Sequence, residues 1–255
     1  MLEIEQILSY KGWIVGGFFL LFLLFEHLKP AVKAGDYAIW RLVKNLSFWP
    51  INIGLSLIII VPLSYFAAQY AFWERPNWLI GISGLLFDFL ILDLFLYCWH
   101  RTVHEIPFLW RFHEVHHLDQ HLDSTSAIRF HFGEIFFAVI FRTLLILLFA
   151  IPFSSVVVFE ILVLVFTLFH HSNMALPDWL EKLLSKIIVT PGIHWVHHHA
   201  VRKDTDSNYS TIFSFWDRLF NTKSKTKRFP KMKIGVEGLK DKSFKRLLFL
   251  PFFRK

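Results

Sequence analysis

Residues 78–117, WLIGISGLLFDFLILDLFLYCWHRTVHEIPFLWRFHEVHH, join a long apolar segment directly to two groups of histidines. The apolar part is long enough for a membrane helix, because about 20 apolar residues cross the hydrocarbon core of a bilayer. His100 and His104 follow at i,i+4 spacing, which puts both imidazoles on one helix face. The stretch therefore predicts a membrane helix that carries metal ligands at its end.

Histidines recur along the chain in a spacing that is typical of metal ligands. The motif HxxHH occurs twice, and His171 is a further candidate between the copies, so we expect each motif to direct its imidazoles toward a common point. A tract that only buffers metal is contiguous, whereas long apolar segments separate these groups. The candidate ligands are His100, His104, His113, His116, His117, His171, His194, His197 and His198.

The number of candidate ligands predicts two metal ions. A structural zinc ion uses about four ligands and a catalytic one about three with water, so nine imidazoles exceed the need of one ion. Imidazole suits zinc, copper, iron and nickel. Cys98 is the single cysteine, which excludes an iron–sulfur cluster and a structural zinc ribbon.

The composition is that of a membrane protein. Hydrophobic residues make up 55% of the 255 residues, with 30 Phe and 10 Trp, which is too apolar for a soluble domain. The net charge of +7 comes from loops and the C-terminal segment, which indicates membrane topology rather than nucleic-acid binding. We expect an all-α integral membrane protein with about four membrane helices, or three and a helical hairpin. A cytosolic helical cap would hold the dimetal site.

Apolar segments define the expected membrane helices. They comprise residues 13–25, 46–73, 78–99, 135–153 and 156–169. Pro50 and Pro62 predict kinks in the second segment. The last two segments are joined by a short corner without charges, and they predict a hairpin with a short second arm and both ends on one side.

The predicted hairpin contains two charged residues, Arg142 and Glu160. At ~1.5 Å per residue from the corner they lie about 18 and 9 Å deep. We therefore expect each to face protein or a cavity rather than to pair directly.

Basic residues set the expected orientation and the division of the chain. The loop after the first segment and residues 223–255 are rich in Lys and Arg, so the histidine groups and the C-terminus are expected on the cytoplasmic side. We expect N-terminal membrane helices in 1–77, a catalytic domain in 78–222, and a basic, aromatic cytosolic tail in 223–255.

Three polar residues are candidates for orienting the ligands. Asp93 precedes His100 on one predicted helix face, so it either accepts a hydrogen bond from a ligand or is hydrogen-bonded within the helix bundle. Glu105 and Asn173 stand beside histidines and either hold them or cap helices. Beyond the metal ligands, the sequence indicates no catalytic side chain, such as a nucleophile.

Further motifs extend the pattern. They are YCWHRTVHEIPFLWRFHEVHH (97–117), TSAIRFHFGE (125–134), HHSNMALP (170–177), TPGIHWVHHH (190–199) and DSNYSTIFSFWDRLFNT (206–222). In order and spacing the chain resembles the fatty acid hydroxylase and sterol desaturase superfamily of membrane di-iron enzymes, and its layout is most similar to the alkylglycerol monooxygenase and bacterial sterol-desaturase-like branch.

The resemblance implies that the nine histidines bind two iron ions and that His131 of RFHFGE is a tenth ligand. Which of His170 and His171 binds metal stays open. The resemblance also implies hydroxylation or desaturation of an unactivated C–H bond of a lipid, of sterol, fatty acyl or alkylglycerol type. The reaction would use O2 and electrons from a separate donor, because the chain has no recognisable nicotinamide, flavin or iron–sulfur module.

Two other kinds of membrane protein gather histidines. A zinc-dependent membrane hydrolase would do so, but the motif HExxH is absent. A metal transporter would hold its ligands near the bilayer midplane, whereas these histidines mostly follow the apolar segments. Zinc is expected to compete in purified protein whatever the native metal is, since such ligands bind it more tightly than ferrous iron.

Overall fold

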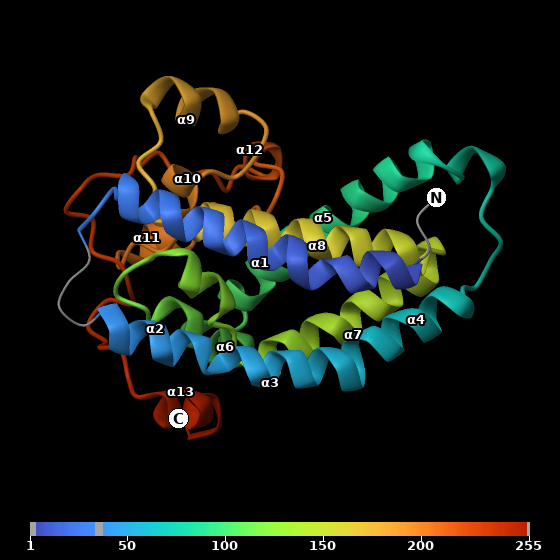
Figure 1. Cartoon of the computed structure of the whole chain (residues 1–255), viewed down its shortest axis with the longest axis horizontal. Helices are drawn as coiled ribbons and strands as arrows, with labels where there is room; N and C mark the ends of the chain where they lie inside the picture. The colour runs from blue at the N-terminus through green and yellow to red at the C-terminus, as the bar shows by residue number, and fades with distance from the viewer. Residues whose placement is uncertain (1–3, 34–37, 254–255) are drawn as a thin grey trace.

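The computed structural model describes residues 4–33 and 38–253, and within these ranges the chain is helical without a β-strand (Figure 1). This confirms the all-α prediction for the described part. The expected N-terminal segment 1–77 and tail 223–255 include residues 1–3, 34–37 and 254–255, which lie outside it. The long helices are α1 (Ile4–Leu28), α5 (Ile82–Glu105), α7 (Phe132–Phe149) and α8 (Phe153–His171).

In the described part of the chain, five helical segments are long and apolar enough to cross a membrane. They are Gln6–Leu28, Ile39–Gln69, Ile82–Glu105, Phe132–Phe149 and Phe153–His171. Large apolar side chains point outward from them: Trp13 is 82% exposed and Ile58 77% exposed. Such surfaces need lipid around them, so the chain is a multi-pass membrane protein. The second arm of the predicted hairpin is not short, because α8 has 19 residues.

The second apolar segment is interrupted near both predicted kinks. The helical span that contains most of it consists of α2 (Ala38–Leu46), α3 (Phe48–Leu55), a π-helical turn (Ser56–Ile60) and α4 (Val61–Gln69). Pro62 cannot donate a backbone hydrogen bond, and the π-helical turn lies directly before it. Pro50 lies in the first turn of α3, where the missing donor costs little.

The long helices are arranged so that ligand-bearing ends meet. In Figure 1 the ends of α1 and α8 and the start of α2 lie toward the same end of the molecule. Residues 106–131 and 172–253 cover this end, and we call them the cap. The cap contains α6 (Pro107–His117), α9 (Asp178–Leu184), α10 (Pro191–His197), α11 (Arg202–Thr205), α12 (Phe215–Leu219) and α13 (Phe244–Phe253).

The two charged residues of the hairpin do pair, contrary to the expectation from their depths. Arg142 Nη2 lies 3.0 Å from Glu160 Oε1, and Lys11 of α1 lies 2.8 Å from Glu160 Oε2. Arg142 also donates to Ser64 Oγ of α4 at 3.2 Å. The backbone rise separates the two Cα atoms in depth, but the long side chains of Arg142 and Glu160 extend far enough to meet. The cluster joins α1, α4, α7 and α8.

Candidate metal centre

The nine candidate histidines form two adjacent groups whose ligand atoms lie within 4.8 Å of one another in each group. The five-histidine group contains His100, His104, His113, His117 and His197, and the four-histidine group contains His116, His171, His194 and His198. The rings of His117 and His198 stack across the boundary with centroids 4.3 Å apart. The number of groups equals the number of metal ions expected from the ligand count.

Each HxxHH motif contributes to both groups, which corrects the expectation that each aims at a single point. His113 and His117 join the five-histidine group, but His116 joins the other. In the second motif, His194 and His198 belong to the four-histidine group and His197 crosses over. Successive helical residues are rotated by about 100°, so when the i,i+4 pair converges on one site, the histidine directly before the second member of the pair can face another site.

Two proline residues position the motifs. Pro107 begins α6 and Pro191 begins α10, where the fixed proline backbone suits the first helical turn. The preceding residues, Ile106 and Thr190, are extended, as expected before proline. Ile106 makes a corner between α5 and α6, so the pair on α5 faces the motif on α6.

In six of the nine histidines the outer ring nitrogen faces a fixed acceptor, whereas Nδ1 of His117, His194 and His198 has no hydrogen-bond partner in the described part of the chain. His100 Nδ1 lies 2.8 Å from the Tyr209 carbonyl, and His197 Nδ1 lies 2.7 Å from the Ser207 carbonyl. His171 Nδ1 lies 2.8 Å from the carbonyl of Thr167. Because a carbonyl only accepts, the proton must be on Nδ1, and Nε2 is left as a bare lone pair.

The Nε2 atoms of both groups point at one another. His113 Nε2 lies 3.2 Å from His100 Nε2 and 3.1 Å from His117 Nε2. His171 Nε2 is 3.0 Å from the Nε2 atoms of both His116 and His194. Metal–nitrogen bonds of about 2.0–2.1 Å would put two ligand nitrogens roughly 3 Å apart. Converging lone pairs at this spacing fit a bound cation in each group.

The protonation of the cap histidines also suits metal binding. Burial, with the neighbouring histidines, lowers the pKa of His116, His117, His194 and His198 well below the usual value. Burial lowers the pKa of His197 to about 3, although the Ser207 carbonyl acts in the opposite direction. These imidazoles are therefore neutral near pH 7, and metal binding does not compete with protons.

His131 is not brought to either group, so its expected role as a tenth ligand is corrected. Its Nε2 lies 2.9 Å from the Leu248 carbonyl of α13. Its Nδ1 accepts a hydrogen bond from the Gly133 amide at 3.0 Å, which makes His131 the N-cap of α7. Both ring nitrogens are used for joining helices.

Asp93 contacts no ligand histidine, and the second reading, a hydrogen-bonded residue inside the bundle, holds. Its carboxylate accepts from the amides of Ile212 and Phe213 at 3.1 and 3.0 Å and from Trp216 Nε1 at 2.9 Å. It thus anchors the loop whose Tyr209 carbonyl accepts from His100. Asp93 positions that ligand through the backbone.

The other two predicted orienting residues also do not contact a ligand histidine. Glu105 is exposed and pairs with Arg101 at 2.7 Å, four residues earlier on α5. Asn173 bonds the backbone of Val32 through its side chain and receives no hydrogen bond from a ligand. Asn173 instead joins the segment after α1 to the cap. His171 belongs to the four-histidine group, whereas His170 belongs to neither group and packs against His194 with ring centroids 4.1 Å apart.

Sequence reasoning missed two carboxylates that face ligand histidines. Glu134 Oε1 lies 2.9 Å from His113 Nδ1, and Asp206 Oδ1 lies 3.3 Å from His104 Nδ1. Glu134 stands in RFHFGE, three residues after His131, so the available signal was an acid inside a matching motif at the start of an apolar helix. The side chain of Glu134 is 7% exposed.

A buried ionic network fixes His116 on the Nδ1 side of its ring. Its Nδ1 lies 3.3 Å from the carbonyl of Arg129, whose guanidinium binds Asp241 at 2.6 and 3.0 Å. Arg41 of α2 binds Asp119 at 2.9 Å. Burial alone would raise the pKa of Asp119, but the charges of Arg41 and Arg129 lower it to about 2. The network joins α2, α6 and the C-terminal segment around the four-histidine group.

Comparison with known sequences agrees with this arrangement. A sequence profile described as fatty acid hydroxylase matches residues 85–222, which is more than half of the chain. The chain belongs to the fatty acid hydroxylase family. The fatty acid hydroxylase segment contains all nine histidines of the two groups as well as Glu134 and Asp206.

Three fatty acid hydroxylase relatives are named as lipid hydroxylases or monooxygenases. The chain is 30% identical over 184 residues to ornithine lipid hydroxylase OlsE of Rhizobium tropici, covering 72% of this chain and 54% of the relative. It is 34% identical over 216 residues to alkylglycerol monooxygenase of Danio rerio, covering 81% and 45%. It is 25% identical over 150 residues to cholesterol 25-hydroxylase of Homo sapiens, covering 58% and 54%. The chain spans about half the length of these relatives, and no solved structure matches it.

Proposed function

We propose that this protein is a membrane di-iron oxygenase that hydroxylates or desaturates an unactivated C–H bond of a lipid. The observation that carries the proposal is the pair of buried histidine groups with converging Nε2 atoms. Lipid hydroxylases and monooxygenases among the relatives support the reaction class. Hydroxylation would consume O2, two electrons and two protons and release one water, so a separate electron donor is part of the proposal.

The residues of this chain would hold and orient the metals. Two irons in these groups would supply the activation of dioxygen. The carbonyls of Tyr209 and Ser207 and the carboxylate of Glu134 keep the ring protons on Nδ1, so that each Nε2 stays free for a metal. No acid or thiolate of the chain is needed as a nucleophile.

Aromatic side chains would keep bulk water from the groups. Phe130 stacks on His116 with ring centroids 4.4 Å apart. Trp110 and Tyr209 pack against His104 at 4.9 and 5.2 Å. An apolar environment of this kind strengthens the electrostatic interactions inside the site and prevents side reactions with water.

The location of the groups supports a lipid substrate. They are formed by the ends of membrane-length helices and by the cap that covers those ends. A lipid chain could therefore remain among apolar helices while its reactive carbon approaches the metals. We also propose that the cap and the C-terminus face the cytoplasm, as the excess of basic residues around the first loop and the tail favours.

The lipid extract of cells that express the protein tests the proposal. We expect an oxygenated or desaturated lipid that requires air and disappears in the double variant His116→Ala, His197→Ala, which removes one residue from each group. His27→Ala is the matched control, because His27 is exposed and belongs to neither group. An unchanged lipid profile under air, or a product that persists in the double variant, would contradict the proposal.

A further inference from the structure

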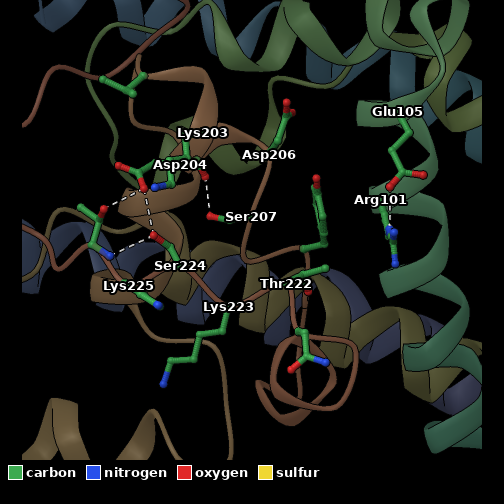
Figure 2. Close-up of a pocket in the computed structure, with 14 residues that line it drawn as sticks. Arg101, Glu105, Lys203, Asp204, Asp206, Ser207, Thr222, Lys223, Ser224 and Lys225 are labelled. Carbon is green, nitrogen blue, oxygen red and sulfur yellow. Dashed lines mark hydrogen bonds and ion pairs between the residues drawn. The ribbon is translucent and has the colours of Figure 1, made fainter.

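A pocket of about 630 Å³ opens between the last turns of α5 and the cap. Figure 2 shows Arg101 and Glu105 on one side, Lys203 and Asp204 on another, and Lys223 on the segment that follows α12. A volume of this size is within the range of small-ligand pockets, about 300–1,000 Å³. It is lined mainly by charged and hydroxyl-bearing residues.

The pocket has an excess of unpaired positive charge. Its acids are already engaged: Glu105 pairs with Arg101, and Asp206 pairs with Arg202. Asp204 accepts hydrogen bonds from Ser224 and Thr226 and faces His199. The three lysines of the lining form no ion pair within the part of the chain that the structure describes. They are Lys203, Lys223 and Lys225.

The pocket lies at the depth where a membrane helix ends. Arg101 and Glu105 occupy the last turns of the candidate span Ile82–Glu105. Exposed apolar side chains flank the pocket, since Leu219 and Phe220 directly precede the lining residue Asn221 and are 63% and 42% exposed. A polar pocket beside exposed apolar residues at the end of a span matches the level of lipid headgroups.

Three residues that line the pocket also contact histidines of the five-histidine group. Tyr209 and Ser207 line the pocket, and their carbonyls accept from His100 and His197. Asp206 lines it as well and lies 3.3 Å from His104 Nδ1. An occupant of the pocket would thus be separated from the ligand histidines by the thickness of one backbone segment.

We propose that this pocket binds a phosphate group, carried by a membrane lipid whose chains lie along α5, and thereby holds the lipid beside the five-histidine group. Lysines and hydroxyl groups bind phosphate oxygens by charge and by donated hydrogen bonds. This inference deepens the proposed function, because it names phosphate-bearing lipids as the class of molecule held next to the site. Phosphate binding itself does not depend on which metals are bound.

Three probes separate the sources of phosphate in binding measurements on the full chain in detergent. They are short-chain phosphatidic acid, diacylglycerol of the same chain length, and glycerol 3-phosphate. We expect phosphatidic acid to bind most tightly. Glycerol 3-phosphate binding as tightly would keep the phosphate site and assign it to a soluble ligand. Equal binding of diacylglycerol and phosphatidic acid would overturn the proposal.

A lysine variant tests whether this pocket is responsible. Lys203→Gln, Lys223→Gln and Lys225→Gln together should weaken phosphatidic acid binding by about 100-fold, since each of the three lysines contributes roughly a factor of five. The matched control changes three exposed lysines outside the pocket, Lys182→Gln, Lys231→Gln and Lys240→Gln, and should bind like the wild type.

Equal binding by the pocket variant and the wild type, or equal weakening in the control, would overturn the proposal. Metal content measured on the same samples separates this result from the proposed function. Loss of phosphate binding with metals retained affects only the pocket. Loss of metals with phosphate binding retained affects only the oxygenase proposal.

Discussion

Removing the carboxylate of Glu134 should weaken one metal site and leave the other intact. Glu134 Oε1 accepts from His113 Nδ1 at 2.9 Å, and both side chains are almost fully buried. His113 belongs to the five-histidine group only. In Glu134→Ala the Nδ1 proton loses its acceptor, the ring is free to turn, and its Nε2 becomes a weaker ligand. Loss of such a partner typically lowers metal affinity by about 10–100-fold.

Competition with a chelator measures this effect on metal-loaded protein. We expect Glu134→Ala to release one metal per chain at a chelator concentration about 10–100-fold below that needed by the wild type. The second metal should leave at the wild-type concentration. Glu134→Gln keeps an oxygen acceptor and should lose less affinity, which separates a local effect from misfolding.

Glu105→Ala is the matched control, because Glu105 is also an acid near the histidines but pairs with Arg101 at the surface. It should release both metals as the wild type does. Wild-type release by Glu134→Ala, or simultaneous weakening of both metals, would refute the role assigned to Glu134.

Three further perturbations have defined outcomes. The metal-free protein should lose stability as the pH falls below about 6.5, because buried neutral histidines such as His197, with a folded pKa of about 3, are protonated first in the unfolded chain. The free energy of unfolding should fall by about 1.4 kcal/mol per histidine and pH unit. Equal melting temperatures at neutral and mildly acidic pH would argue against this. Asp93→Asn should lower the free energy of unfolding by at least about 2 kcal/mol in thermal melting, because the buried amide of Ile212 or Phe213 then faces an NH2 group. Wild-type melting would show that other contacts hold this loop. Asp241→Asn should expose the C-terminal segment to limited proteolysis, because the buried Arg129 guanidinium loses the carboxylate that it binds at 2.6 Å and keeps only Asp119 at 3.9 Å. Unchanged cleavage would count against the network.

The helices and the gathering of histidines could be predicted because both depend on local spacing. Apolar runs of membrane length become the long helices, and i,i+4 spacing places His100 with His104 on one face. The crossing of His116 and His197 into opposite groups is not local. It depends on how the two short helices are rotated against each other, which is set by tertiary packing.

The partners of the histidines could not be found from motifs. Most of them are backbone carbonyls, such as those of Tyr209 and Ser207, and a carbonyl carries no sequence signature. His131 shows the opposite problem, because the resemblance to the family implies a ligand at this position while its ring caps α7 and bonds α13. The pairing of Arg142 with Glu160 depends on side-chain length, which counting the helical rise omits.

The metal content of the full chain, measured by mass spectrometry after purification from iron-supplemented cells, tests the central claim most directly. We predict two iron ions per chain in the wild type, one for each histidine group. His194→Ala should lower the occupancy of one group and leave the other iron bound. A single metal ion per chain in the wild type, or none, would contradict a dinuclear centre built from these nine histidines.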